Sequence, residues 1–171
     1  NNNPDVRIEL PGNLGKAARA MKMLGQGKQV TALENSMNRA AEAAIPQAQE
    51  LLLDAVKKMT ISDAKGILNG PENSATAYLD KSSREQLRSR FLPMIEQVTQ
   101  SSGLAQQYNN FAGQAANFGV IDAKDASIEN YVAEQALDGL FTIIAEQEAS
   151  IRQNPTQAAS DIAKKVFGLI R

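Results

Sequence analysis

Residues 30–59 have the sequence VTALENSMNRAAEAAIPQAQELLLDAVKKM, and their pattern indicates how the chain folds. The apolar positions recur at intervals of three and four, at Val30, Leu33, Met37, Ala40, Ala44, Ala48, Leu52, Ala55 and Met59. This spacing predicts an α-helix with one apolar face, which must be buried against other elements. Pro46 stands inside the pattern, so the helix either kinks there or stops at Ile45 and restarts with Pro46 in its first turn.

Further helices are expected on both sides of this stretch. They are expected to begin at Asn13, at the N-cap Ser62, near Ser74, at the Ser82–Glu85 capping box, at residue 104, at Ser127 and after Asn154-Pro155. Asn69-Gly70-Pro71 is expected to end the helix that Ser62 starts. The helix from Ser127 to Gln153 is the longest, and Pro93 predicts a second kink. The sequence therefore predicts an all-α fold, a single compact bundle of about seven or eight helices.

Residues 1–12 have a different pattern. Apolar Val6, Ile8 and Leu10 alternate with polar residues, and prolines bound the segment. Alternation of this kind predicts a short extended N-terminal arm over 1–12, followed by an all-helical domain over 13–171. The chain begins without an initiator Met, so we expect that a targeting segment has been removed.

The composition excludes several classes of function. The 171 residues include no His and no Cys, which removes Ser–His and Cys–His nucleophile pairs, disulfides and most zinc or copper sites. A formal net charge of −1 argues against general nucleic-acid binding. No apolar run is long enough for a transmembrane segment.

Residues 97–121 contain no charged side chain, but they carry an apolar and aromatic stripe at helical spacing. Such a stripe usually belongs to the core. The alternative is a groove for a small neutral ligand or a protein partner, with Tyr108, Phe111 and Phe118 as the contact residues.

Asp138 is the single charge within ALDGLFTIIA, residues 136–145. The apolar neighbours predict that this carboxylate is buried, and a buried charge needs a partner. Arg39 is the preferred partner and Lys65 the second. The Arg39–Asp138 ion pair would fix how two helices pack or, alternatively, supply an ionisable pair at a cavity.

Ser62 and Lys65 match the Ser-x-x-Lys spacing of serine acylases, in which a lysine one turn later activates the serine. Neither a Ser-Asp-Asn nor a Lys-Thr-Gly element accompanies this motif. N-capping by Ser62 explains the serine without chemistry.

Metal and cofactor sites are not expected. Carboxylates at Glu42, Glu134, Asp138 and Glu146 could face one another in a bundle, but di-iron bundles need His and no EF-hand loop is present. The sequence therefore predicts no metal and no cofactor.

Two basic segments have simple interpretations. Lys81, Arg84 and Arg88 span two helical turns and are expected to form a solvated face. The C-terminal residues 162–170 combine apolar side chains with Lys164-Lys165, so docking on the core is expected and peripheral membrane contact is the alternative.

Five motifs occur in a fixed order after Leu10-Pro11 and a basic helix. They are Ser36–Glu42 (SMNRAAE), Ser62–Lys65 (SDAK), Ile67–Gly70 (ILNG), Ala136–Phe141 (ALDGLF) and Ile151–Pro155 (IRQNP). In these the chain resembles the bacterial domain-of-unknown-function family 4197 over nearly its whole length. The resemblance implies an all-helical domain, usually preceded by a secretion leader, and a periplasmic or envelope-associated location. It implies no catalytic residues.

Two functions follow as hypotheses. The first is a non-catalytic, soluble helical binding or interaction module of the bacterial envelope. The alternative is a hydrolase or lyase that uses Ser62 and Lys65 or a carboxylate pair around Asp138.

Overall fold

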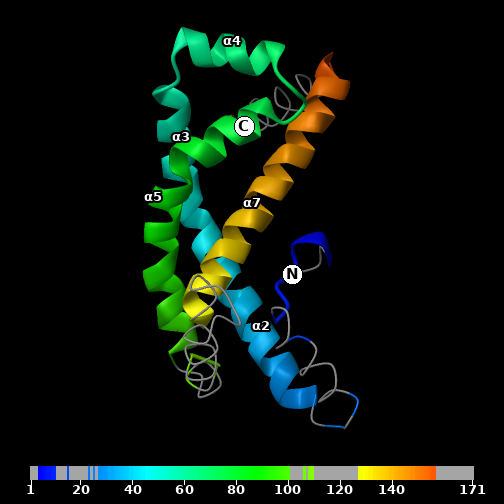
Figure 1. Ribbon diagram of the computed structural model, residues 1–171, viewed down its shortest axis with the longest axis vertical. Coiled ribbons are helices and arrows are strands. Elements are labelled where there is room, and N and C mark those ends of the chain that lie inside the picture. The colour runs from blue at the N-terminus through cyan, green and yellow to red at the C-terminus, as the bar shows by residue number, and fades with distance from the viewer. Residues whose placement is uncertain are drawn as a thin grey trace, which may run out of the picture.

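A computed structural model of the chain describes residues 4–10, 27–100 and 127–156, together with positions 15, 23, 25, 106, 108 and 109. Helices and short turns make up these segments, in the order η1 (Pro4–Val6), α2 (Gly27–Ala44), η2 (Ile45–Gln47), α3 (Ala48–Lys57), α4 (Ile61–Asn69), α5 (Ser74–Thr99) and α7 (Ile128–Gln153) (Figure 1). The described segments contain no strand, which confirms the all-α class. The helices expected over 13–24, most of 104–118 and after Pro155 lie outside them.

Pro46 divides the first long helical stretch without reversing the chain. Helix α2 ends at Ala44, a 3-10 turn covers Ile45–Gln47, and α3 begins at Ala48. Both Ala44 and Ala48 keep right-handed helical dihedrals, with φ −81° and −69°. The missing N–H of proline is thus accommodated by a tighter turn, and α3 continues where α2 ends.

Two predicted helix starts are wrong. Thr60, and not Ser62, caps α4: its hydroxyl accepts from the Asp63 N–H, and the Asp63 carboxylate accepts from the Thr60 N–H. Ser82 starts no helix, because α5 runs unbroken from Ser74 to Thr99 and includes Pro93. The Ser82 hydroxyl donates to the Tyr78 carbonyl one turn earlier, which satisfies it inside the helix.

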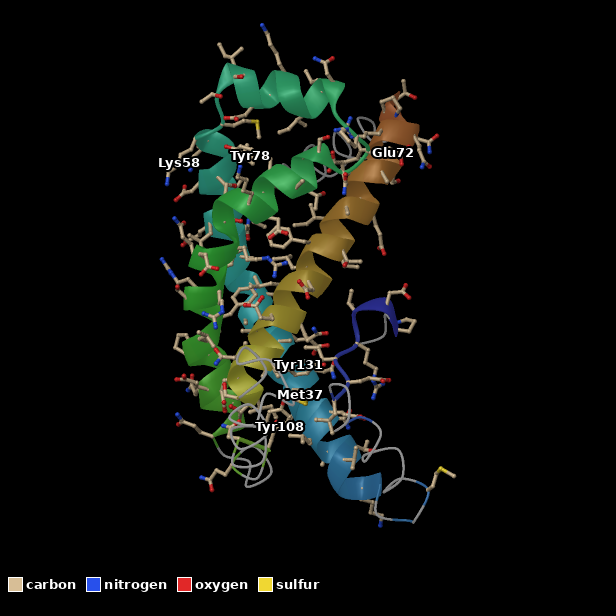
Figure 2. All side chains as sticks on the ribbon, viewed as in Figure 1. Met37, Lys58, Glu72, Tyr78, Tyr108 and Tyr131 are labelled. Carbon is tan, nitrogen blue, oxygen red and sulfur yellow. The ribbon has the colours of Figure 1, made fainter. Side chains whose placement is uncertain are left out.

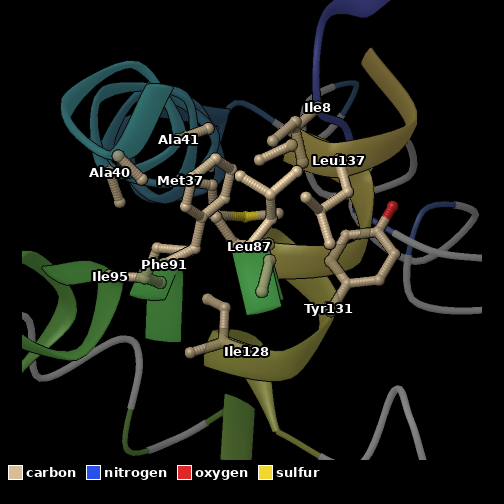
Figure 3. Close-up of a cluster of buried hydrophobic side chains, with 14 of the residues drawn as sticks. Ile8, Met37, Ala40, Ala41, Leu87, Phe91, Ile95, Ile128, Tyr131 and Leu137 are labelled. Atoms are coloured by element: carbon tan, nitrogen blue, oxygen red, sulfur yellow. The ribbon is translucent and has the colours of Figure 1, made fainter. Parts of the chain in front are cut away.

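The core lies where α2, α5 and α7 meet (Figure 3). Met37 of α2 packs among Leu87 and Phe91 of α5 and Leu137 of α7, and all four side chains are fully buried. Small residues such as Ala40 on α2 let the helix backbones approach closely. Each buried Leu, Met or Phe side chain contributes roughly 1.5–3 kcal/mol through removal of its apolar surface from water.

The N-terminal segment packs against α2 and α7. Ile8 is only 2% exposed and belongs to the core. The Ile8 N–H donates to Asn38 Oδ1 at 3.0 Å, and Asn38 Nδ2 donates back to the Ile8 carbonyl at 2.8 Å. The Tyr131 hydroxyl donates to the Glu9 carbonyl at 2.6 Å. The segment that is expected to be extended thus begins with a 3-10 turn, and long-range hydrogen bonds hold Ile8 and Glu9 in place.

Candidate functional site

A groove opens between the N-terminal segment, α2 and α7, with a cavity of about 210 Å³. Most of its wall is apolar, formed by Val6, Ala41, Ile45, Ala136, Leu140 and Ile143. Val6 comes close to α7 because position 139 is glycine: a Cβ there would lie 3.2 Å from the Val6 Cβ. The three walls therefore come from parts of the sequence that are far apart. We call this cavity the α2–α7 groove.

A few polar side chains border the α2–α7 groove. They are Arg7, Asn38, Glu42 and Gln135. The Asn38 amide is already engaged, because it exchanges two hydrogen bonds with Ile8 and donates a third to the Glu34 carbonyl at 2.7 Å. Its role is to hold one wall of the groove in place. Arg7 and Gln135 are polar groups that could orient a ligand at the rim.

The size of the groove limits what it can hold. Pockets for drug-sized ligands measure roughly 300–1,000 Å³, whereas an engineered apolar cavity of about 150 Å³ binds benzene. A cavity of about 210 Å³ therefore fits one aromatic ring or one branched aliphatic group. None of the described residues that line it is a serine, threonine or lysine, so the described part of its wall offers apolar contact and no hydroxyl or amine nucleophile.

The structure describes one of the three aromatic residues proposed as groove contacts. Tyr108 is buried at 6% exposure and belongs to the core, and it does not line the α2–α7 groove (Figure 2). Phe111 and Phe118 lie outside the described residues.

The prediction of a buried Arg39–Asp138 pair is wrong. The Asp138 side chain is 56% exposed, and its carboxylate pairs with Arg84 Nη2 at 2.8 Å. Arg39 is exposed on α2. Asp138 lies on the rim of the α5–α7 contact, because the apolar residues around it in the sequence occupy the other faces of the same helix.

Arg84 is the centre of an ionic cluster between α5 and α7. Its guanidinium contacts Asp80 at 2.6 Å, Glu134 at 3.1 Å and Asp138 at 2.8 Å. Arg88 pairs with Glu134 at 2.8 Å. Burial acts to lower the pKa of Arg84, but the hydrogen bonds to Asp80 and Asp138 outweigh it and raise the pKa. Arg84 therefore stays charged, and its contacts join the two helices.

The prediction of a solvated face is wrong for Arg84 and Arg88, although Lys81 is exposed. A signal for the cluster is present in the sequence: Arg84 and Arg88 are one turn apart, and so are Glu134 and Asp138. Residues four apart lie on the same face of a helix, so the two pairs mark one basic and one acidic helical face.

A second polar contact joins the end of α7 to the α4–α5 corner. Glu148 accepts from the N–H groups of Ala75 and Thr76 and pairs with Arg152 at 2.8 Å. Arg152 also donates to the Ile67 carbonyl of α4 at 2.9 Å. Burial acts to raise the pKa of Glu148, but these hydrogen bonds outweigh it and lower the pKa to about 2. The contact is structural, because every one of its groups has a partner.

The Ser-x-x-Lys motif does not form a site. Ser62 and Lys65 are both exposed on α4. No hydrogen bond joins their side chains in the described part of the chain, and the two residues line neither the α2–α7 groove nor the small pocket between α3 and α5. Without a contact between the two groups, the lysine cannot activate the serine.

Neither a metal site nor a membrane span is present among the described residues. No three acidic side chains in that part of the chain lie close enough together to bind a metal ion. None of the helices there has both the length and the apolar character needed to cross a membrane.

Comparison with known proteins identifies a family and nothing closer. Residues 1–168 match the model of a family described as "Protein of unknown function (DUF4197)". Neither the curated proteins nor the solved structures gave a match. The family match confirms the resemblance carried by the five ordered motifs and covers almost the whole chain. The chain therefore belongs to the DUF4197 family of proteins of unknown function.

Proposed function

We propose that the protein is a non-catalytic binding module that takes an apolar group of a ligand or partner into the α2–α7 groove. The observation that supports this proposal is the cavity of about 210 Å³, which few polar groups border. A concave, mainly apolar pocket with a small number of polar side chains at its edge is the usual form of a ligand site.

The size of the groove limits which part of a ligand can enter it. Only one ring or branched chain fits inside, so a larger ligand would leave its remainder at the rim. There Arg7 and Gln135 could contact polar atoms of the ligand. A location in the bacterial envelope, which the family resemblance implies, is part of this proposal.

The test is a titration with toluene, followed by the methyl NMR signals of the protein. Saturable shifts are expected at Ala41, Ile45 and Ile143, which line the groove. Ala41→Phe fills the cavity and is expected to weaken binding at least about tenfold, a loss of about 1.4 kcal/mol. The matched control is Ala43→Phe, at an exposed position of the same helix.

Ala41 is nearly buried, so a second variant protects the test against misfolding. Ile45→Trp enlarges a side chain at the groove that is 36% exposed, and it is expected to weaken binding without crowding the core. Equal toluene binding by wild type and both groove variants would overturn the proposal. Native mass spectrometry of protein from its own host would then identify any retained ligand.

A further inference from the structure

One end of the molecule carries exposed aliphatic side chains that nothing in the described structure covers. On α4, Ile61 is 78% exposed and Leu68 76% exposed. Lys65 is exposed between them, and the spacing i, i+4, i+7 places all three on one side of the helix. We call these three residues the α4 face. Helix α4 forms one end of the long axis of the molecule (Figure 1), and none of the three residues lines the α2–α7 groove or the small pocket between α3 and α5.

The end of α3, next to α4, also carries exposed aliphatic and basic side chains. Leu53 and Val56 of α3 are 51% and 49% exposed, one turn apart. Lys57 and Lys58 follow them at the end of α3, and Figure 2 shows Lys58 at the corner between α3 and α4. Exposed aliphatic and cationic side chains thus occur together at this corner.

Two acidic residues at this end, Asp54 and Asp63, are engaged by other groups, and the exposed Glu72 lies beyond the end of α4. Asp54 pairs with Lys57 at 3.6 Å. Asp63 lies two residues after Ile61, on the opposite side of α4, and its carboxylate accepts from Thr60. The hydrogen bonds from Thr60 lower the pKa of Asp63. The charged carboxylate is therefore favoured where it accepts these bonds, in the cap of α4. The α4 face itself therefore presents only apolar groups and a cation.

The position of α4 is fixed at both ends. The Thr60–Asp63 capping box starts the helix, and Arg152 of α7 donates to the Ile67 carbonyl near its end at 2.9 Å. Ile61 and Leu68 are thus exposed on a helix whose two ends are fixed, and their exposure is not the result of fraying.

We propose that the α4 face docks on an anionic lipid surface. Ile61 and Leu68 would enter the boundary between headgroups and acyl chains, and Lys65 with Lys58 would remain at the level of the anionic headgroups. Exposed aliphatic side chains at one end of the molecule fit a fluid lipid surface, whereas a protein partner would have to supply a groove for them. A second copy is disfavoured, because antiparallel pairing of two α4 faces places Lys65 against its own equivalent.

The proposal is independent of the α2–α7 groove, with which the α4 face shares no residue. The test is flotation of the whole chain with phosphatidylcholine vesicles, with and without phosphatidylglycerol. Binding is expected only with the anionic lipid and is expected to weaken at high salt. The double variant Ile61→Ser/Leu68→Ser is expected to lose at least about tenfold in vesicle partition, and Lys65→Glu a smaller amount.

A matched control uses an exposed apolar residue far from α4. Met23 is 88% exposed, so Met23→Ser is expected to leave flotation unchanged. The proposal is overturned if the wild type stays in the soluble fraction with anionic vesicles, or if Met23→Ser and the double variant weaken flotation equally. It is also overturned if sedimentation shows a dimer that only the double variant abolishes, because the occupant would then be a second copy.

Discussion

Glu148, near the end of α7, caps the first turn of α5 through Thr76, whose N–H and hydroxyl each donate to the carboxylate at 2.8 Å. The residue at the N-cap position of this helix, Asn73, makes no side-chain hydrogen bond to it. The first N–H groups of a helix have no partner within the helix, and a carboxylate at this end is favoured by the helix dipole. A residue 72 positions away thus replaces the local cap.

Glu148→Gln is expected to destabilise the protein by about 2 kcal/mol at neutral pH, because a neutral amide cannot replace the charged acceptor of these hydrogen bonds. Urea unfolding measures the change. The matched control is Glu146→Gln, at an exposed position on the same helix, which is expected to change stability by less than about 0.5 kcal/mol.

Because of the Glu148 carboxylate, the free energy of unfolding is expected to depend on pH. The pKa of Glu148 falls from 4.5 to about 2 on folding, so its contribution is complete above pH 4.5 and is lost as the pH falls toward 2. The difference in unfolding free energy between wild type and Glu148→Gln should therefore shrink over this range. A constant difference down to pH 2 would contradict the role of the charge.

Arg84→Met is expected to lower the unfolding free energy by about 1–2 kcal/mol, because it keeps the apolar stem and removes the charge that three carboxylates share. Asp138→Asn is expected to change stability by less than about 1 kcal/mol, since exposed ion pairs contribute little. Thermal unfolding at low and high salt measures both changes, and added salt should reduce the effect of Asp138→Asn more.

A double-mutant cycle distinguishes the observed pair from the one that the sequence suggests. Arg84 and Asp138 should show a coupling energy of about 0.2–1 kcal/mol. Arg39 and Asp138 should show none, because Asp138 faces α5. Coupling of Arg39 equal to that of Arg84 would mean that the two helices pack differently in solution.

Asn38→Leu is expected to destabilise the protein by about 2–4 kcal/mol, because the Ile8 N–H and carbonyl lose their partner in a buried place. Hydrogen exchange at the Ile8 amide should become faster as the N-terminal segment opens. Asn35→Leu, at an exposed position of α2, is the control. Unchanged exchange at Ile8 in Asn38→Leu would show that apolar contact alone holds the segment.

Local signals predict several elements correctly. Ser127 is predicted to start a long helix and Gln153 to end it, and α7 covers Ile128–Gln153 with Ser127 as its N-cap. Helix α4 ends at Asn69, at the Asn-Gly-Pro that is predicted to stop it. These features depend on side chains within one turn of the chain, so the spacing of residues is sufficient to predict them.

Features that join distant residues required the tertiary structure. From the spacing of residues alone, Asp138 is predicted to be buried and paired with Arg39. In the structure, the rotation of α7 against α5 turns Asp138 outward to Arg84. The α2–α7 groove depends on long-range contacts of the N-terminal segment, among them the hydrogen bonds by which Asn38 holds Ile8.

The amino-acid sequence thus specifies the all-α class, the family and most boundaries of the described helices, because helix formation and termination depend on local periodicity and capping. Tertiary packing specifies which charges meet, which helix end Glu148 caps and which apolar residues remain exposed on α4. These outcomes depend on how whole helices rotate against one another, and the buried side chains of Met37, Leu87, Phe91 and Leu137 pack where those helices meet (Figure 3).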